Sequence, residues 1–580
     1  MMSDGRELYE FTWPGKREAV LEAGRHIDKV LRPSIDDSVN FWTTENLYIE
    51  GDNLEALKLL QKSYMHKVKM IYIDPPYNTG HDFIYHDKFS QSEGEARAQF
   101  ELYDEENTRN FTMSHYRENV RSNPRYHSEW CSMMYPRLRL AQNLLREDGV
   151  IFISIDDNEA ANLRKICDEV FGEDNFRNQI IVRRGAKSVQ AQFDTWDKLG
   201  RDFEYILFYT KSPTYRFPKQ LRTVDTPKAG TWNNHWRGTD RPTMRYELFG
   251  ITPATGQWRW SKDRSEAAIA NYDRMLAELG TDTPSQEEID EWYEQQQEDI
   301  DLLRMSKSGK PEHYIPPVST TLLNSSWMDL LVGSSSEISA LFGQKFFDTP
   351  KLTSVITRML QFIDSDSLVL DFFAGSSTTA HAVMSLNASD SGHRKFIMVQ
   401  LPEPCPPSSE AAKSGYSTIS ELGRERIRRA SSRLAQDFPL TAGHIDYGFR
   451  TLRIDSSNFR SVFMSAESLS QDNLDSLVDN IKPSRSPLDL LFMCITDLGL
   501  PLSLTCSQEN ISGFNVLTYG ENLITACFDP DITEDIIRTI SQRKPVNAIF
   551  RDSCFSSSQD RINLEQIFRY YSQTSRMIII

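Results

Sequence analysis

A carboxylate, two prolines and an aromatic ring directly follow a short apolar run. Residues 70–73 predict a buried strand, which Pro75 and Pro76 end because proline cannot donate to a sheet ladder. Asp74 and Tyr77 therefore stand at the carboxyl end of a strand, where open α/β sheets bind ligands. The Asp74 carboxylate and the Pro75 carbonyl can each accept a hydrogen, and the Tyr77 ring offers a flat face to a planar ligand.

Residues 74–77, Asp-Pro-Pro-Tyr, resemble motif IV of the amino-methyltransferases, which methylate exocyclic amino groups of DNA bases with S-adenosylmethionine. Such an amine is a poor nucleophile because its lone pair is delocalised into the ring. The resemblance implies that Asp74 and Pro75 each accept one amino hydrogen, with the prolines fixing the carbonyl in advance. Tyr77 would hold a base taken out of the double helix. The alternative is an ordinary strand end, with Asp74 capping a turn.

A second strand, small-residue turn and helix are predicted at 367–383. The turn runs from Asp371 to Thr378, and its small residues let the backbone approach a ligand closely. The N-terminus of the following helix favours a polar group. The next strand leads to Glu403, an acidic residue placed for ribose hydroxyls by the logic of dinucleotide folds. By itself, this turn could also be an ordinary strand-to-helix connection.

The same turn resembles motif I, the cofactor-binding loop of the amino-methyltransferases, except that Ser377 stands where the family has glycine. Serine could tighten the loop against the cofactor, or weaken binding if the backbone needs a positive φ. Residues 347–351 resemble motif X, on the methionine side of the cofactor, with Leu352 in place of the usual proline. The resemblance implies these cofactor-binding residues: Asp52, Asn78, Thr349, Lys351, Asp371, Phe373, Ala374, Gly375, Ser377, Thr378 and Glu403.

Cations alternate with aromatic residues between the two motifs, over a stretch poor in predicted regular structure. This pattern suits a nucleic-acid surface, on which cations neutralise phosphates and rings contact bases. The alternative is a solvated basic surface. The residues that we expect to bind DNA are Arg183, Arg184, Lys187, Lys211, Arg216, Lys219, Arg237 and Arg241.

Alternating helices and apolar strands are predicted to position these motifs. Strands are expected at 46–50, 70–73, 150–155, 205–209, 367–371 and 395–399, and helices at 16–31, 54–60, 130–145 and 421–433. A further helix, capped by residues 156–158, should run through Val170. The alternation predicts a parallel, doubly wound α/β sheet. The polar segment 82–123 predicts a functional or mobile loop, and the acidic segment 284–304 an exposed helix without chemistry.

Composition sets broad limits on the 580-residue chain. Its length predicts two or three domains, and a hydrophobic fraction of 39% with a mean hydropathy of −0.50 indicates a soluble protein. The sequence contains no run of about 18 apolar residues, so no membrane span is predicted. The acidic N-terminus does not resemble a signal peptide. Seven scattered cysteines suit reduced thiols in a cytoplasm. A net charge of −17 argues against indiscriminate coating of nucleic acid but permits a local DNA-binding face.

The motif order, with the catalytic motif first and the cofactor motif last, is the β arrangement of the amino-methyltransferases. Residues 48–57, 74–80 and 148–159, and a C-terminal series from 532 to 568, resemble the modification (Mod) subunit of type III restriction-modification systems. The resemblance implies a Rossmann-like methyltransferase of prokaryotic cytoplasm that methylates N6 of adenine in a short asymmetric site of double-stranded DNA. It also implies a Mod homodimer and a Res helicase-nuclease partner.

The predicted domains are an N-terminal segment (1–45), a catalytic half (46–210), a target-recognition domain (211–330), a cofactor-binding half (331–435) and a small C-terminal α/β domain (436–580). Three alternatives stay open. A solitary methyltransferase would share every motif, and an N4-cytosine enzyme needs the same amine chemistry. A DNA-binding protein with an inactive cofactor site is suggested by Ser377.

Overall fold

The computed structural model describes residues 10–80, 83–85, 116–184, 202–239, 241–296, 299–333, 335–347, 350–460, 481–555 and 558–580. The chain divides into two compact units, Met1–Pro218 with Ser325–Ile580, and Lys219–Asn324. The second unit lies within the range predicted for target recognition, 211–330. Across the described residues, no helix combines the length and apolarity needed to cross a membrane.

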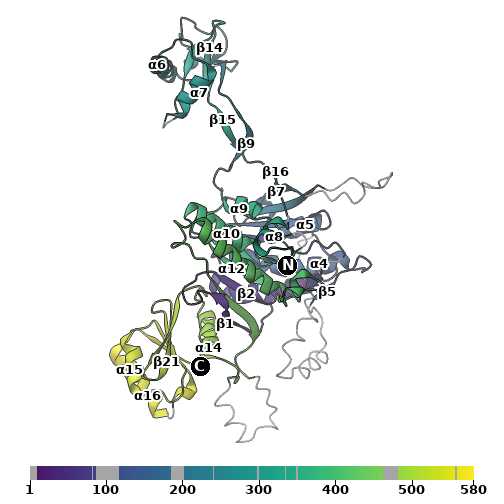
Figure 1. Cartoon of the computed structure of the whole chain (residues 1–580), viewed down its shortest axis with the longest axis vertical. Helices are drawn as coiled ribbons and strands as arrows, with labels where there is room; N and C mark the ends of the chain where they lie inside the picture. The colour runs from purple at the N-terminus through teal and green to yellow at the C-terminus, as the bar shows by residue number, and fades with distance from the viewer. Residues whose placement is uncertain are drawn as a thin grey trace, which may run out of the picture. The chain divides into compact units, whose positions relative to one another are not determined.

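A ten-stranded sheet forms the centre of the first unit (Figure 1). Its order is β1 (Lys29–Val39), β19 (Phe449–Ser456), β2 (Leu47–Glu50), β18 (Lys395–Gln400), β17 (Leu368–Asp371), β3 (Val68–Ile73), β6 (Leu145–Ile155), β8 (Phe203–Thr210), β7 (Phe176–Arg183) and β16 (Ser326–Leu331). From β19 to β6 all neighbours are parallel, whereas β1 and β8 run antiparallel to the strands beside them. The predicted mostly parallel α/β sheet is therefore confirmed.

The sheet order reverses between β17 and β3. From β17 the chain proceeds to β18 on one side, and from β3 it proceeds to β6 on the other. Leu370 of β17 lies opposite Ile71 of β3, so the two strands end side by side. Such a reversal leaves a crevice beyond the carboxyl ends of the strands, where doubly wound proteins bind ligands.

Helices cover both faces of the sheet. One group is α1 (Lys16–Ala23), α2 (Asn53–Tyr64), α4 (Tyr126–Leu144) and α5 (Ala160–Phe171); the other is α8 (Ser336–Phe342), α9 (Thr353–Leu360), α10 (Thr378–Asp390) and α12 (Ile419–Asp437), and a short α11 spans Glu410–Lys413. Ile71 and Ile73 lie in the core that contains α2 and α4. On the opposite face, Phe152 and Phe208 contact Phe362, which follows α9, at ring-centroid distances of 5.6 and 5.5 Å.

Two local predictions were wrong. The predicted helix 16–31 is α1 followed by strand β1, because residues from Lys29 onward pair with β19. The predicted cap at 156–158 is instead a turn in which Asp156 accepts from the backbone N–H of Asn158, and α5 begins at Ala160. Within the predicted loop 82–123, β4 (Phe83–Tyr85) pairs antiparallel with β5 (Tyr116–Glu118).

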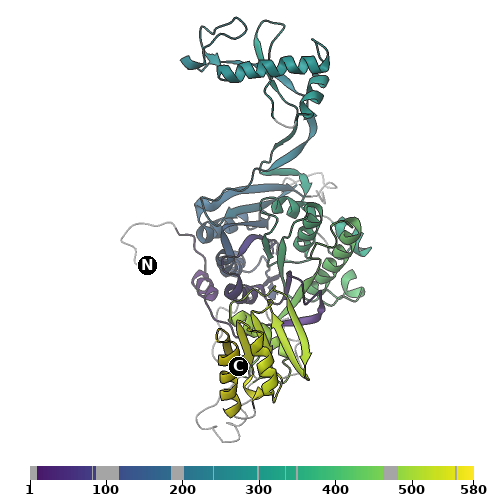
Figure 2. The same ribbon diagram turned by 90° about the vertical axis from the view of Figure 1, so that its left-hand side faces the viewer.

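The C-terminal region adds a five-stranded sheet of β20 (Cys506–Ile511), β21 (Phe514–Tyr519), β22 (Ile524–Cys527), β23 (Asn547–Phe550) and β24 (Arg576–Ile579). The helices α15 (Glu534–Gln542) and α16 (Ser558–Tyr571) pack together on one of its faces (Figure 2). The predicted C-terminal domain, 436–580, is not separate from the large sheet, because it contains β19.

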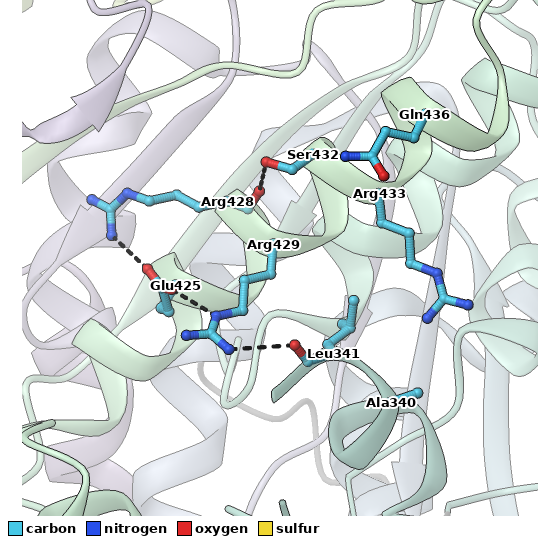
Figure 3. Close-up of a pocket in the computed structure, with 8 residues that line it drawn as sticks. All are labelled: Ala340, Leu341, Glu425, Arg428, Arg429, Ser432, Arg433 and Gln436. Carbon is cyan, nitrogen blue, oxygen red and sulfur yellow. Dashed lines mark hydrogen bonds and ion pairs between the residues drawn. The ribbon is translucent and has the colours of Figure 1, made fainter. Parts of the chain in front are cut away.

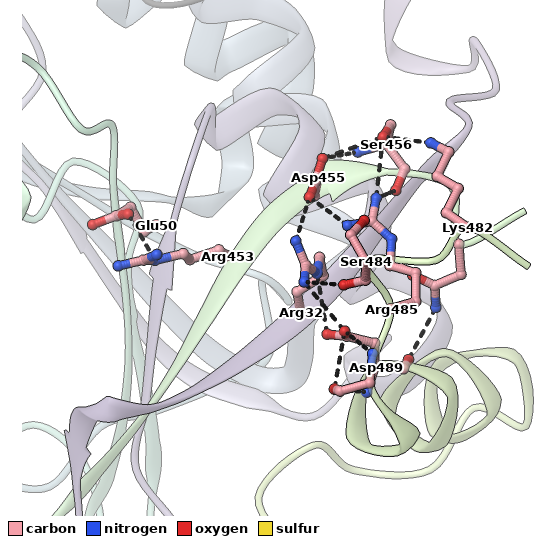
Figure 4. Close-up of polar contacts among 11 residues, drawn as sticks. Arg32, Glu50, Arg453, Asp455, Ser456, Lys482, Ser484, Arg485 and Asp489 are labelled. Atoms are coloured by element: carbon pink, nitrogen blue, oxygen red, sulfur yellow. Dashed lines mark hydrogen bonds and ion pairs between the residues drawn. The ribbon is translucent and has the colours of Figure 1, made fainter. Parts of the chain in front are cut away.

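The helix α14 (Pro487–Asp497) ties this region to the large sheet through contacts with β1 and α2. Arg32 of β1 forms ion pairs with Asp455 of β19 at 2.8 Å and with Asp489 of α14 at 3.1 Å (Figure 4). Arg485 also pairs with Asp455, at 2.9 Å. One guanidinium thus joins the edge strand β1 and its neighbour β19 to a helix of the C-terminal region.

The second unit contains β9 (Leu221–Lys228) paired with β15 (Val318–Leu322), a sheet of β10 (Thr231–Asn234), β14 (Pro311–Ile315) and β13 (Leu303–Met305), and β11 (Trp236–Arg237) paired with β12 (Gln257–Trp258). Its helices are α6 (Lys262–Leu279) and α7 (Gln286–Glu294). The acidic segment predicted as an exposed helix holds α7, but Ile289 and Trp292 are buried. One face of α7 therefore belongs to the core of this unit.

Candidate active site

Two carboxylates stand where the sheet order reverses. Asp371 ends β17 and is 3% exposed, whereas the side chain of Asp74, directly after β3, is 30% exposed. Burial raises the pKa of Asp371 to about 7, despite hydrogen bonds from Thr379 Oγ1 (2.6 Å) and the backbone N–H of Phe373 (3.0 Å). Burial also raises the pKa of Asp74, and the nearby ammonium of Lys351 opposes that effect.

The ammonium group of Lys351 lies among the polar side chains around Asp74. Lys351 Nζ is 3.3 Å from Asp74 Oδ1, 2.8 Å from Glu204 Oε2 and 2.6 Å from the Tyr77 hydroxyl. The Tyr77 hydroxyl donates to Glu204 Oε2 at 3.0 Å. Lys351 was predicted to contact the cofactor, and the structure places its ammonium against the catalytic motif. Glu204 was missed, although a carboxylate within the apolar strand at 203–210 was a usable signal.

The Pro-Pro turn is held by groups behind it. Trp130 Nε1 donates to the Pro76 carbonyl at 2.7 Å, and the Tyr126 hydroxyl donates to the carbonyl of Asn78. Asn78 has a φ of +58°, and its fully buried amide donates to Glu159 at 2.5 Å. The Asn78 side chain, predicted to bind the cofactor, therefore lies among protein groups that fix the turn.

The predicted cofactor loop joins β17 to α10. The backbone N–H of Ala374 donates to the Val399 carbonyl at 3.1 Å, and that of Gly375 donates to Gln400 Oε1 at 2.7 Å, so β18 anchors the loop. Ser377 precedes α10 with a φ of +61° and is fully buried. The position at which the family has glycine therefore has the left-handed backbone that favours glycine.

Arginines of α12 support this loop, and sequence reasoning missed them. Arg426 is fully buried and donates to Ser376 Oγ at 2.9 Å and to Thr378 Oγ1 at 2.6 Å. Burial lowers the pKa of Arg426 to about 10, although Glu337 opposes that effect. Thr378 was predicted to bind the cofactor, and in the structure its hydroxyl also links α10 to α12 through Arg426.

The remaining predicted cofactor residues border the loop. Asp52 caps α2, accepting from the backbone N–H groups of Leu54 (2.8 Å) and Glu55 (3.1 Å). Glu403 follows β18, and burial raises its pKa. Phe373 and Ala374 are buried with exposed fractions of 8% and 6%. Thr349 lies outside the described residues.

The predicted DNA-binding residues fall on both units. Arg183 and Arg184 are exposed at the end of β7, where Arg184 Nε lies 3.4 Å from Glu204. In the loop after β8, Lys211 donates to the Gln142 carbonyl at 2.8 Å and Arg216 to the Pro213 carbonyl at 2.9 Å. The predicted DNA-binding residues of the second unit, Lys219, Arg237 and Arg241, are exposed. Lys187 lies outside the described residues.

A cavity of about 460 Å³ lies between α8 and α12 (Figure 3). Glu425 lines it and forms ion pairs with Arg428 at 3.6 Å and with Arg429 at 2.7 Å. Its arginines are therefore partly neutralised, and we assign the candidate site to the strand ends at Asp74 and Asp371 instead.

Comparisons with known proteins agree on one family. A family model described as DNA methylase matches residues 68–403. The StyLTI Mod subunit, a type III restriction-modification enzyme subunit of Salmonella typhimurium, is 33% identical over 77% of this chain and 66% of its own length. The EcoPI Mod subunit of Escherichia phage P1 is 30% identical, covering 98% of this chain and 91% of that subunit. The EcoP15I Mod subunit of Escherichia coli is 28% identical over 98% and 90%.

Proposed function

Because this chain belongs to the DNA methylase family, and within it to the Mod subunits of type III restriction-modification enzymes, we propose that it methylates N6 of adenine in double-stranded DNA. The observation that carries this proposal is the partly exposed Asp74 carboxylate beside the end of β17. It stands next to the loop that the sequence matches to a cofactor-binding motif. S-adenosylmethionine is the methyl donor of this reaction.

The charges around Asp74 fit that cofactor. Three carboxyl groups, those of Asp74, Glu204 and Asp371, stand near two cations, Lys351 (3.3 Å from Asp74 and 2.8 Å from Glu204) and Arg184 (3.4 Å from Glu204). Carboxyl groups that outnumber the cations favour a ligand with a positive centre, such as a sulfonium. We propose that residues of the β17–α10 loop, with Asp52 and Glu403 at its borders, hold the cofactor, which supplies an electrophilic methyl group.

The chain's own residues would prepare the adenine amine. Asp74 accepts one amino hydrogen and the Pro75 carbonyl accepts the other, which moves the nitrogen lone pair out of the ring. Trp130 already donates to the Pro76 carbonyl, which leaves Pro75 as the candidate acceptor. The same Asp74 carboxylate is placed to take the proton that the nitrogen loses after it gains the methyl group.

The adenine has to leave the double helix, since its amine cannot reach the Asp74 carboxylate while it is stacked. We propose that Tyr77 contacts the flipped base with its ring, which packs partly buried against the core. The exposed cations Lys219, Arg237 and Arg241 would contact phosphates. Base reading would belong to the second unit.

The partners follow from the family. We propose that the chain forms a homodimer and joins a Res helicase-nuclease subunit in the cytoplasm of a prokaryote. In such a complex, methylation protects the cell's own sites, and this subunit supplies recognition for cleavage. Co-purification with the product of a neighbouring helicase-nuclease gene tests the Res partner, and light scattering tests the dimer.

The decisive experiment is methyl transfer from labelled S-adenosylmethionine to unmethylated DNA, with the product nucleoside identified by mass spectrometry. We expect N6-methyladenine from the wild-type protein. N4-methylcytosine would keep the amine chemistry and correct the base. Absence of any product, with DNA still bound, would favour the DNA-binding protein without transfer activity and would contradict the proposal.

A further inference from the structure

Side chains from three separate segments surround the Asp74 carboxylate: Tyr77 in the turn, Glu204 on β8 and Lys351 before α9. We propose that Lys351, anchored by Glu204, holds the Asp74 carboxylate ionised and oriented toward the amine, so that both are positioning residues for methyl transfer. The inference rests on the proposed function, because it assigns Asp74 the role of accepting the hydrogens of the amine.

The three charged groups do not share their contacts equally. Lys351 is 10% exposed and Glu204 is 6% exposed, so each needs its partner to remain charged. The ammonium lies closer to Glu204 (2.8 Å) than to Asp74 (3.3 Å). Glu204 is therefore the anchor, and Asp74 is the carboxylate that keeps exposed surface for a substrate.

The surroundings raise the pKa of Asp74 and lower the pKa of Glu204. Burial raises the pKa of Asp74, and Glu204 adds to that effect, whereas Lys351 opposes it. Burial by itself would also raise the pKa of Glu204, but Lys351 and Arg184 together hold that pKa below its ordinary value. Glu204 is thus ionised across the neutral range, and the ionisation of Asp74 depends on the charge of Lys351.

The other groups that act on Asp74 lie on its own strand, in its turn and on the neighbouring strand. Burial holds the pKa values of Tyr72 on β3 and of Tyr77 well above the ordinary value, so both are neutral. Asp371 on β17, with a pKa of about 7, adds a carboxyl group that titrates near neutral pH. Protonated Asp74 would itself carry a hydrogen on one oxygen and would lose an acceptor for the amine.

The test is the pH profile of single-turnover methyl transfer, expressed as the ratio of the rates at pH 5.5 and pH 8. In Lys351→Met, the Asp74 carboxylate faces Glu204 without the ammonium that lay between them, while Arg184 stays 3.4 Å from Glu204. We expect the acid limb to move upward by about one to two pH units, so the ratio falls. In Glu204→Gln, a repelling charge is lost and Lys351 pairs with Asp74 alone. We expect a lower plateau rate and an acid limb at lower pH, so the ratio rises.

Three further variants separate this role from a structural one. The double variant Lys351→Met/Glu204→Gln restores the original charge balance, so its acid limb should return toward that of the wild type. Lys351→Arg keeps the positive charge, so its acid limb should lie near that of the wild type, at a reduced plateau rate. Lys69→Met is the matched control, because Lys69 is a 2% exposed lysine at the other end of β3, paired with Asp148 at 2.8 Å. It should lower the unfolding temperature and leave the acid limb in place.

Binding measurements complete the test. If Lys351 acts on Asp74, Lys351→Met should change the Kd for S-adenosylmethionine less than about fivefold, whereas a direct cofactor contact would cost more, about tenfold for each 1.4 kcal/mol. Acid limbs that stay in place, or that move in the same direction in Lys351→Met and Glu204→Gln, would overturn the inference while wild-type transfer stands. Absence of transfer by the wild type would overturn the proposed function instead.

Discussion

A Cβ on Gly423 would lie 2.7 Å from Oγ of Ser377, so the serine of the cofactor loop is matched by a glycine on α12. The same Cβ would lie 3.1 Å from the Gly375 carbonyl oxygen. The missing side chain at Gly423 thus makes room for the side chain that the family does not have at Ser377. This match explains how the buried Ser377 side chain is accommodated beside α12 at the start of α10.

Gly423→Ala should therefore displace the cofactor loop. Overpacking at a buried site costs about 1–3 kcal/mol, and we expect the Kd for S-adenosylmethionine to rise about tenfold or more, measured by calorimetry. Ser377→Gly alone should change the Kd less than about threefold. The double variant Gly423→Ala/Ser377→Gly should recover part of the affinity, since the 2.7 Å contact is gone while those with the Tyr48 hydroxyl (2.9 Å) and the Gly375 carbonyl oxygen (3.1 Å) remain. Equal affinity losses in the single and double variants would show that the two residues do not interact.

The parts of the site that could be predicted are those with local signals. An apolar run ended by Pro75 predicted the end of β3, and Asp371 with its small-residue turn predicted the end of β17. A doubly wound sheet brings such strand ends together, and the pairing of Leu370 with Ile71 agrees with that expectation. Periodicity and strand-breaking residues suffice here because each signal lies within a few residues of the site.

The supporting groups were missed, because they come from distant segments and only the fold shows which site they reach. Glu204 reaches the site because β8 inserts antiparallel between β6 and β7, a pairing that no local pattern specifies. Arg426 looked like one more charge on a polar helix, yet it is buried against the cofactor loop. The predicted helix at 16–31 failed for the same reason, since its last residues, from Lys29 onward, pair with β19.

Asp74→Ala should abolish transfer without unfolding the protein. Loss of this acceptor should reduce the single-turnover rate by about a thousandfold. Lys351 would keep its 2.8 Å ion pair with Glu204, so no buried charge is left without a partner. We expect DNA binding, measured by fluorescence anisotropy, and cofactor binding, measured by calorimetry, to stay within about threefold of the wild-type values. Turnover at the wild-type rate, or loss of folding, would contradict the assignment of Asp74.

Arg32→Met should loosen the C-terminal region. The variant leaves Asp489, which is 2% exposed, without its guanidinium partner, and removes one of the two cations beside Asp455. We expect unfolding to become easier by about 2 kcal/mol, measured by urea denaturation. Arg453→Met is the comparison, because Arg453 lies on the same strand as Asp455 but is 50% exposed and should contribute less than about 1 kcal/mol.

The same network predicts a response to strong acid. Burial by itself would raise the pKa of Asp455, but the hydrogen bond from Arg32 and the charge of Arg485 lower that pKa to about 2. Its contribution to stability is therefore present above pH 3.8 and is lost as the pH falls toward 2. Asp455→Asn should be less stable than the wild type at pH 6, and the difference should shrink below pH 3.8 in urea titrations. A difference that is independent of pH would show that the charge of Asp455 does not matter.

Mild acid should instead loosen the second unit, because it buries two neutral histidines. His235 is fully buried, and its ring centroid lies 5.6 Å from that of His313. Burial lowers the pKa of His235 to about 3, and burial with nearby Arg259 also lowers the pKa of His313. The unfolded unit therefore binds more protons than the folded one below pH 6.5. Its stability is complete above that pH and should fall by at most about 1.4 kcal/mol per pH unit for each histidine.

Hydrogen exchange of the full chain, corrected for intrinsic rates, measures this effect by peptide. Between pH 7.5 and pH 5.5, protection should fall in peptides from Lys219–Asn324 and change less in peptides of β3 and β17. His235→Phe keeps a ring at the same place but cannot take up a proton, so about half of the pH dependence should disappear. Because Ser265 Oγ retains the Tyr246 hydroxyl at 2.7 Å, that variant should stay folded at pH 7.5. An unchanged pH dependence in His235→Phe would assign the acid sensitivity to other groups.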